Sequence, residues 1–115
     1  MMIPDLNKTA IYISPGITDM RKQINGLAVV VQDELEKDPF ASTLFLFCNR
    51  RRRILKALWW ESNGFCLWQK RLEKDRFPWP ADEGAAREIS TEELKMLLAG
   101  IDFWKAHKKL DYRKV

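Results

Sequence analysis

The stretch "TLFLFCNRRRRILKALWWESNGFCLWQKRL", residues 43–72, contains three apolar runs separated by two short polar breaks. Its first run, residues 43–48, is apolar at successive positions, which is typical of a strand covered on both faces of a sheet. Asn49–Arg53 forms the first break, and five residues is an ordinary length for a hairpin loop. Asn63 and Gly64 mark the second break, since both tolerate the positive φ of a tight turn. The stretch therefore predicts three consecutive antiparallel strands.

Two helices and a further strand are expected on either side of this stretch. "TAIYISPG", residues 9–16, predicts a short strand that ends at a proline and a glycine. Apolar residues then recur every three or four positions, which predicts a helix from a Thr18 cap to about Glu36. Ser90 and Glu93 have the spacing of a capping box at the start of a second helix. "RFPWP", residues 76–80, contains prolines that restrict it to an edge strand or to irregular structure.

This order of elements predicts the α+β class. We expect one domain over residues 1–104, with an antiparallel meander sheet of about four to five strands and two helices packed on one face. Residues 105–115 are interpreted as a basic C-terminal tail. The chain has 115 residues, which fits one domain and leaves little room for a second.

Several classes of protein are disfavoured by composition. No apolar run approaches the roughly 20 residues of a transmembrane helix, and no basic flank with an apolar stretch opens the chain as a secretory signal would. Cys48 and Cys66 each lie in an apolar strand-like run, so both are expected to be buried and reduced. We therefore expect a cytoplasmic protein that does not engage a membrane.

Positive charge is concentrated in one part of the chain. Residues 50–76 hold nine basic and three acidic side chains, whereas the whole chain has a net charge of +4. In an antiparallel hairpin the end of the second arm lies beside the start of the first, so Lys70, Arg71 and Lys74 should gather near the arginine loop. Arginine forks match phosphate oxygens, and phosphate contacts dominate non-specific nucleic-acid binding. The candidate nucleic-acid-binding residues are Arg50, Arg51, Arg52, Arg53, Lys70, Arg71 and Lys74. A solvated turn that keeps the sheet end soluble is the alternative interpretation.

The sequence offers no constellation that would support catalysis. His107 is the single histidine and has no acidic partner near it in sequence. The two cysteines do not form a zinc-binding pair, and the glycines are isolated, so no metal site, phosphate loop or cofactor is predicted. Nothing in the spacing of the carboxylates selects three of them for a two-metal site. We therefore expect a protein that is not an enzyme.

Three segments in the right order resemble a known family. They are "GITDMRKQINGLA" at residues 16–28, the run at residues 38–80 and "STEELKMLLAGID" at residues 90–102. The chain resembles, over roughly residues 3–104, the TnpB-type accessory proteins encoded by the second open reading frame of the bacterial insertion-sequence family sixty-six. These are not the RNA-guided nucleases of the same name. The resemblance implies a role in transposition beside a separate, larger transposase.

Together these observations predict a non-catalytic accessory protein of transposition that contacts the DNA backbone through a basic rim, without sequence preference. The alternative is a protein–protein adaptor that binds the element's transposase and does not contact DNA. Four tryptophans are interpreted mainly as core or oligomer-interface residues, with base stacking as a further option: Trp59, Trp60, Trp68 and Trp79. Homo-oligomerisation therefore stays open.

Overall fold

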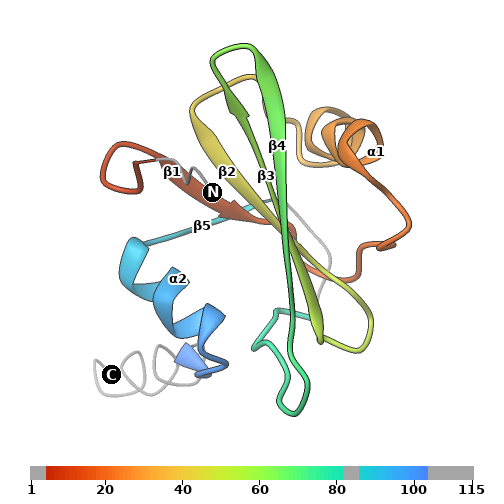
Figure 1. The fold of residues 1–115 in the computed structure, drawn as a ribbon, viewed down its shortest axis with the longest axis vertical. Helices are drawn as coiled ribbons and strands as arrows, with labels where there is room; N and C mark the ends of the chain where they lie inside the picture. The colour runs from red at the N-terminus through yellow and green to blue at the C-terminus, as the bar shows by residue number, and fades with distance from the viewer. Residues whose placement is uncertain (1–4, 82–85, 104–115) are drawn as a thin grey trace, which may run out of the picture.

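The computed structural model describes residues 5–81 and 86–103, and these residues form one five-stranded sheet with helices (Figure 1). The elements, in chain order, are β1 (Ala10–Ile13), α1 (Ile24–Val29), the π-helical segment η1 (Val30–Glu34), β2 (Thr43–Cys48), β3 (Ile54–Glu61), β4 (Gly64–Arg71), β5 (Arg87–Ile89) and α2 (Thr91–Leu98). Their order in the sheet is β4-β3-β2-β1-β5. The predicted α+β class is confirmed, whereas the expected tail at residues 105–115 and His107 lie outside the described residues.

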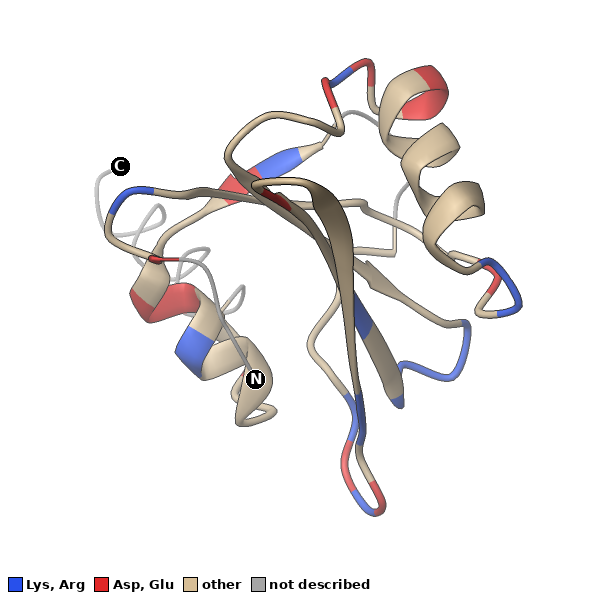
Figure 2. Cartoon of the chain, turned by 45° about the horizontal axis from the view of Figure 1, so that its top comes forward, with Lys and Arg blue, Asp and Glu red and all other residues tan. Residues whose placement is uncertain are grey.

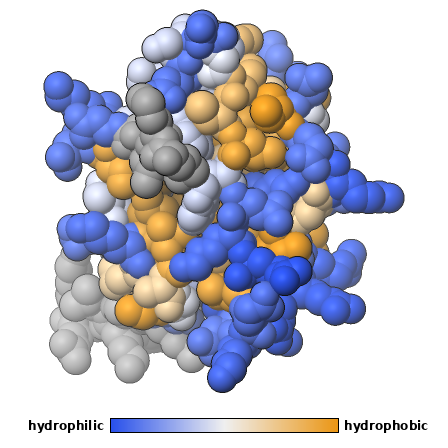
Figure 3. Space-filling model, in the orientation of Figure 1, coloured by the Kyte–Doolittle hydropathy of each residue, from blue (hydrophilic) through white to orange (hydrophobic). Residues whose placement is uncertain are grey.

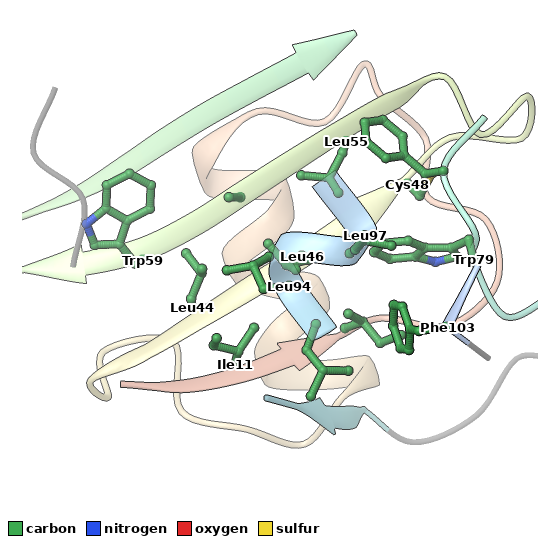
Figure 4. Close-up of a cluster of buried hydrophobic side chains, with 14 residues drawn as sticks. Ile11, Leu44, Leu46, Cys48, Leu55, Trp59, Trp79, Leu94, Leu97 and Phe103 are labelled. Atoms are coloured by element: carbon green, nitrogen blue, oxygen red, sulfur yellow. The ribbon is translucent and has the colours of Figure 1, made fainter. Parts of the chain in front are cut away.

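Strand β2 lies at the centre of the sheet and is buried along its whole length, as its sequence predicts. Successive side chains of a strand point to opposite faces, and each face of β2 contributes to a different hydrophobic cluster. Leu44, Leu46 and Cys48 pack with Leu94 and Leu97 of α2 (Figure 4). The other face of the strand packs with α1 and η1, through Phe45, Phe47, Leu27, Val30 and Val31.

The expectation that both helices cover one face is therefore wrong, and so is the expectation of a pure meander. Strands β1 and β2 pair in parallel, from Ala10 beside Thr43 to Ile13 beside Leu46. Parallel neighbours need a crossover connection, and α1 supplies it on one face of the sheet. Helix α2 follows β5 and covers the opposite face, so that α1 and α2 lie on either side of the sheet in Figure 1. The other strand pairs are antiparallel.

The fifth strand comes from a segment that the sequence pattern does not mark. Arg87–Ile89 forms β5, which pairs with the edge of β1 through Ile11 and Ile89. Residues 76–80, by contrast, have no strand structure, in keeping with their prolines. A strand of three residues is too short to show a recognisable period in sequence, and only its pairing with β1 identifies it.

The β3–β4 hairpin is present, but its turn lies one residue earlier than expected. Glu61 pairs with Gly64, so Ser62 and Asn63 are the two turn residues. Ser62 is the one with positive φ, at 52°. Gly64 already belongs to β4, so the glycine opens the returning strand rather than occupying the turn itself.

Helix α2 begins with the predicted capping box. The Ser90 hydroxyl accepts a hydrogen bond from the Glu93 amide (3.1 Å), and the Ser90 amide donates to the Glu93 carboxylate (2.9 Å). Ile89 and Leu94, on either side of the capping box, are buried in the same hydrophobic cluster.

We predict that Ser90→Ala lowers the free energy of unfolding by about 1 kcal/mol, because an N-cap side chain satisfies an otherwise unpaired helix amide. Urea denaturation followed by circular dichroism measures this change. Ser42→Ala, at an exposed position outside any helix, is the matched control and should change stability by less than about 0.5 kcal/mol. Equal effects of the two substitutions would contradict a stabilising role for the cap.

Candidate nucleic-acid interface

Three loops meet at one end of the sheet and carry most of the Lys and Arg side chains of the described residues (Figure 2). They are residues 18–22 before α1, residues 49–53 between β2 and β3, and residues 70–77, which include the end of β4. Backbone hydrogen bonds join them: the Thr18 amide donates to the Cys48 carbonyl (2.9 Å), and the Phe77 amide donates to the Arg52 carbonyl (2.7 Å). We call these three segments the basic end.

The arginine loop owes its shape to Asn49. The Asn49 side-chain oxygen accepts hydrogen bonds from the amides of Arg53 (2.9 Å) and Ile54 (3.1 Å). Its own amide donates to the Ile54 carbonyl (3.1 Å), which closes the loop at its base. Arg52 has a positive φ of 59°, the strained position of the turn. Asn49 therefore holds the connection in one defined shape, as asparagine commonly does in turns.

The four arginines differ in what they contact. Arg50 and Arg51 are exposed, and neither forms an ion pair within the described part of the chain. Arg52 and Arg53 are half-buried. The Arg53 guanidinium donates to the Glu73 carbonyl (2.9 Å) and so ties the arginine loop to the loop after β4. Arg50 and Arg51 are thus presented to solvent, whereas Arg53 contributes to the structure of the site.

The expected gathering of the β4 residues near the arginine loop is confirmed by the strand register. Arg71 pairs with Ile54, and Lys70 pairs with Leu55, at the start of β3. Arg71 also forms an exposed ion pair with Glu73 (2.9 Å). The Lys70 ammonium donates to the Leu98 carbonyl (3.0 Å) at the end of α2, so it is partly engaged within the protein.

Lys74 is exposed and makes no ion pair among the described residues. The binding role of the seven predicted residues stays a prediction. They differ in solvent exposure and in their partners within the protein: Arg50, Arg51 and Lys74 are exposed and form no ion pair in the described residues. On the face shown in Figure 3, strongly hydrophilic side chains crowd the lower right and leave apolar patches between them.

The sequence pattern misses two basic residues of this end, Arg21 and Lys22. The helix expected from Thr18 would have carried them on its first turns, but α1 begins at Ile24. Residues 18–22 instead form a loop, in which the Asp19 carboxylate accepts from the Arg21 amide (2.9 Å) and from its guanidinium (2.7 Å). These hydrogen bonds lower the pKa of Asp19 to about 2. No signal in the sequence places this loop beside the arginines, since the contact is with the end of β2.

Lys56 contacts the loop at residues 18–22, before the start of α1. Its side chain points from β3 into the α1 face and is 2% exposed. The Lys56 ammonium donates to the carbonyls of Met20 (2.8 Å) and Lys22 (2.9 Å), which helical residues would have used for backbone bonds. Burial lowers the pKa of Lys56 from its ordinary value. A buried lysine thus holds the loop at residues 18–22 in its non-helical path.

The two cysteines lie on different strands, β2 and β4, and both are free thiols. Burial raises the pKa of the Cys48 thiol to about 12, which keeps it protonated and weakly reactive. Cys66 is half-buried rather than buried as expected, and its thiol donates to the Glu61 carboxylate (3.6 Å). Among residues 5–81 and 86–103, no three His, Cys, Asp or Glu side chains cluster as a metal ion would require.

Two of the four tryptophans, Trp59 and Trp79, are buried in the α2-side core, as the core interpretation expects. Trp60 and Trp68 are half-buried. Trp60 points to the face opposite Trp59, and its ring packs against Phe40 and Phe65 with centroids 5.0 Å apart in each pair. Trp60 and Phe65 flank the β3–β4 turn, so this aromatic group lies at the far end of the hairpin from the arginines.

Comparison with known proteins relates the chain to insertion sequences. The profile of a family described as "IS66 Orf2 like protein" matches residues 9–108. A protein of Sinorhizobium fredii (strain NBRC 101917 / NGR234), named "Uncharacterized protein y4hO", is 41% identical over 102 residues, which cover 89% of each chain. A second from the same strain, "Uncharacterized protein y4jC", is 31% identical over 99 residues, covering 86% of this chain and 85% of its own. No solved structure matches the chain.

No helix in the part of the chain that the structure describes is long and apolar enough to cross a membrane.

The buried ammonium of Lys56 should make the stability of the folded protein depend on pH. Because the folded protein lowers its pKa, the unfolded chain binds this proton more readily between the lowered pKa and the ordinary value of 10.5. The free energy of unfolding of the wild-type protein should therefore rise, relative to that of Lys56→Met, as the pH increases through the lowered pKa toward 10.5. Urea denaturation across this range measures the difference. Lys74→Met, which removes an exposed lysine, is the control, and equal pH profiles for wild type and Lys56→Met would contradict the claim.

Proposed function

The chain belongs to the family of IS66 Orf2-like proteins, and from this membership we propose that it is a non-catalytic accessory protein of transposition that contacts the DNA backbone through its basic end. The family links the chain to transposition of an insertion sequence. The DNA contact, the absence of catalysis and a place of action in the cytoplasm are our inferences. They are argued from the residues below.

The observation that carries the proposal is the presentation of Arg50 and Arg51. Both residues are exposed in the loop whose base Asn49 closes, and neither forms an ion pair in the described part of the chain. An arginine fork can bind two phosphate oxygens at once, and such charge-assisted bonds are among the strongest that a surface can offer. Two adjacent forks of this kind suit a polyanion better than a single small anion.

The excess of positive charge around Arg50 and Arg51 also favours DNA as the partner. The basic end, residues 18–22, 49–53 and 70–77, holds ten basic and three acidic side chains. Two of the acids, Asp19 and Glu73, already pair with Arg21 and Arg71. A surface with this excess attracts DNA from a distance and in a salt-dependent manner. Phosphate contacts carry no sequence information, so we propose binding without strong sequence preference.

A second candidate function is supported by the aromatic group at the opposite end of the hairpin. Phe40 is 57% exposed, and its ring packs against Trp60 and Phe65 with centroids 5.0 and 5.3 Å away. Exposed aromatic side chains are enriched among the residues that dominate protein–protein interfaces. This surface is suited to an adaptor that binds the element's transposase. The two functions use different ends of the molecule and are therefore separable by mutation.

We predict that Arg50→Ser with Arg51→Ser weakens binding to a duplex and reduces the slope of log affinity against log salt by about 1.8, since each lost phosphate contact reduces it by about 0.9. Fluorescence anisotropy of a labelled duplex across a salt series measures this slope. The control is Lys8→Ser with Lys95→Ser, which removes the same charge from exposed positions outside the basic end.

Equal losses in the two double variants would show that net charge, and not the arginine loop, governs binding. Absence of duplex binding by the wild-type protein, together with co-purification with the transposase that Phe40→Ser abolishes, would support the adaptor function instead.

A further inference from the structure

A hollow of about 650 Å³ lies beside the arginine loop. One wall comes from the loop before α1, with Ile17, Asp19 and Met20, and the other comes from Arg50 and Arg51. Its size lies within the roughly 300 to 1,000 Å³ of sites that bind small ligands. A single nucleotide is a ligand in this size range, whereas a DNA duplex is far larger than the hollow.

The two walls differ in chemistry. Ile17 is 54% exposed, so about half of its side chain is available for contact with a ligand. The guanidiniums of Arg50 and Arg51, which have no ion pairs in the described residues, line the same hollow. An apolar surface beside a phosphate-binding surface matches a nucleotide, whose base has an apolar face and whose phosphate is anionic.

We propose that this hollow binds an unpaired nucleotide of DNA, with its phosphate on Arg50 and Arg51 and its base against Ile17 and Met20. The proposal rests on the proposed function, because it specifies the form of DNA that the basic end prefers. Ion pairing with Arg21 offsets the charge of the Asp19 carboxylate, so the guanidiniums of Arg50 and Arg51 decide where the phosphate binds. The protein would then favour DNA with an unpaired base, such as a strand overhang, over a fully paired duplex.

The hollow is formed before any ligand arrives. The Thr18 amide donates to the Cys48 carbonyl (2.9 Å), which fastens one wall to the end of β2. The buried Lys56 ammonium holds the carbonyls of Met20 and Lys22 on the same wall. Asn49 fixes the base of the opposite loop through two backbone amides. A preformed site loses less conformational entropy on binding than a loop that must first become ordered.

Fluorescence anisotropy with three probes tests the proposal: a blunt duplex, the same duplex with a short single-stranded overhang, and the single strand alone. The wild-type protein should bind the overhang duplex about fivefold more tightly than the blunt one, as expected for burying roughly half of an isoleucine side chain. Ile17→Ser should remove this preference and leave blunt-duplex affinity within about twofold, because phosphate contacts govern the latter. Val29→Ser, at a position on α1 with 53% exposure, is the matched control and should retain the preference.

The outcomes separate this inference from the proposed function. Equal binding of blunt and overhang duplexes by the wild-type protein would overturn the nucleotide site while leaving backbone binding intact. An equal loss of preference in Ile17→Ser and Val29→Ser would also overturn it. Absence of binding to all three probes would overturn the proposed function and the nucleotide site together. Circular dichroism of each variant verifies that it is folded.

Discussion

The burial of β2 on both faces is the constraint on which the rest of the structure depends. A strand whose every residue is apolar or shielded needs a layer on each side, and one helix cannot supply both. Helix α1 covers Phe45 and Phe47, and α2 covers Leu44 and Leu46. The parallel pairing of β1 with β2 follows from the same need, because it lets the connection between them cross one face as a helix.

The basic end is a consequence of this arrangement. Strands β1 and β2 run in the same direction, so the loops that leave them emerge at the same end of the sheet. The antiparallel β3–β4 hairpin returns to that end at Arg71. Three segments far apart in sequence are thus brought together by topology. Two polar side chains within the protein, Lys56 and Asn49, then fix the loops through backbone hydrogen bonds, so that exposed charge rests on a rigid support.

The sequence predicted the structure correctly where the signal was a long apolar run or a spacing between residues close together in the chain. The β2–β3–β4 run, the loop at Asn49–Arg53 and the Ser90 capping box follow from apolar runs, loop length and short-range spacing. The predictions were wrong or incomplete where a contact between residues far apart in the sequence determines the local structure. Lys56 contacts the loop that precedes α1, β5 is identified by its pairing with β1, and the crossover between β1 and β2 places α1 on its face of the sheet. Proximity of Lys70 and Arg71 to the arginines followed from hairpin geometry, whereas Arg21 and Lys22 had no such local signal.

The most direct test of the account is a nuclear magnetic resonance titration of the ¹⁵N-labelled protein with a short duplex. The account predicts that the amide signals that shift are those of the basic end, residues 18–22, 49–53 and 70–77. Signals at the far end of the hairpin, around Ser62, should stay in place. Shifts concentrated around Phe40, Trp60 and Phe65, or no shifts at all, would contradict DNA binding by the basic end.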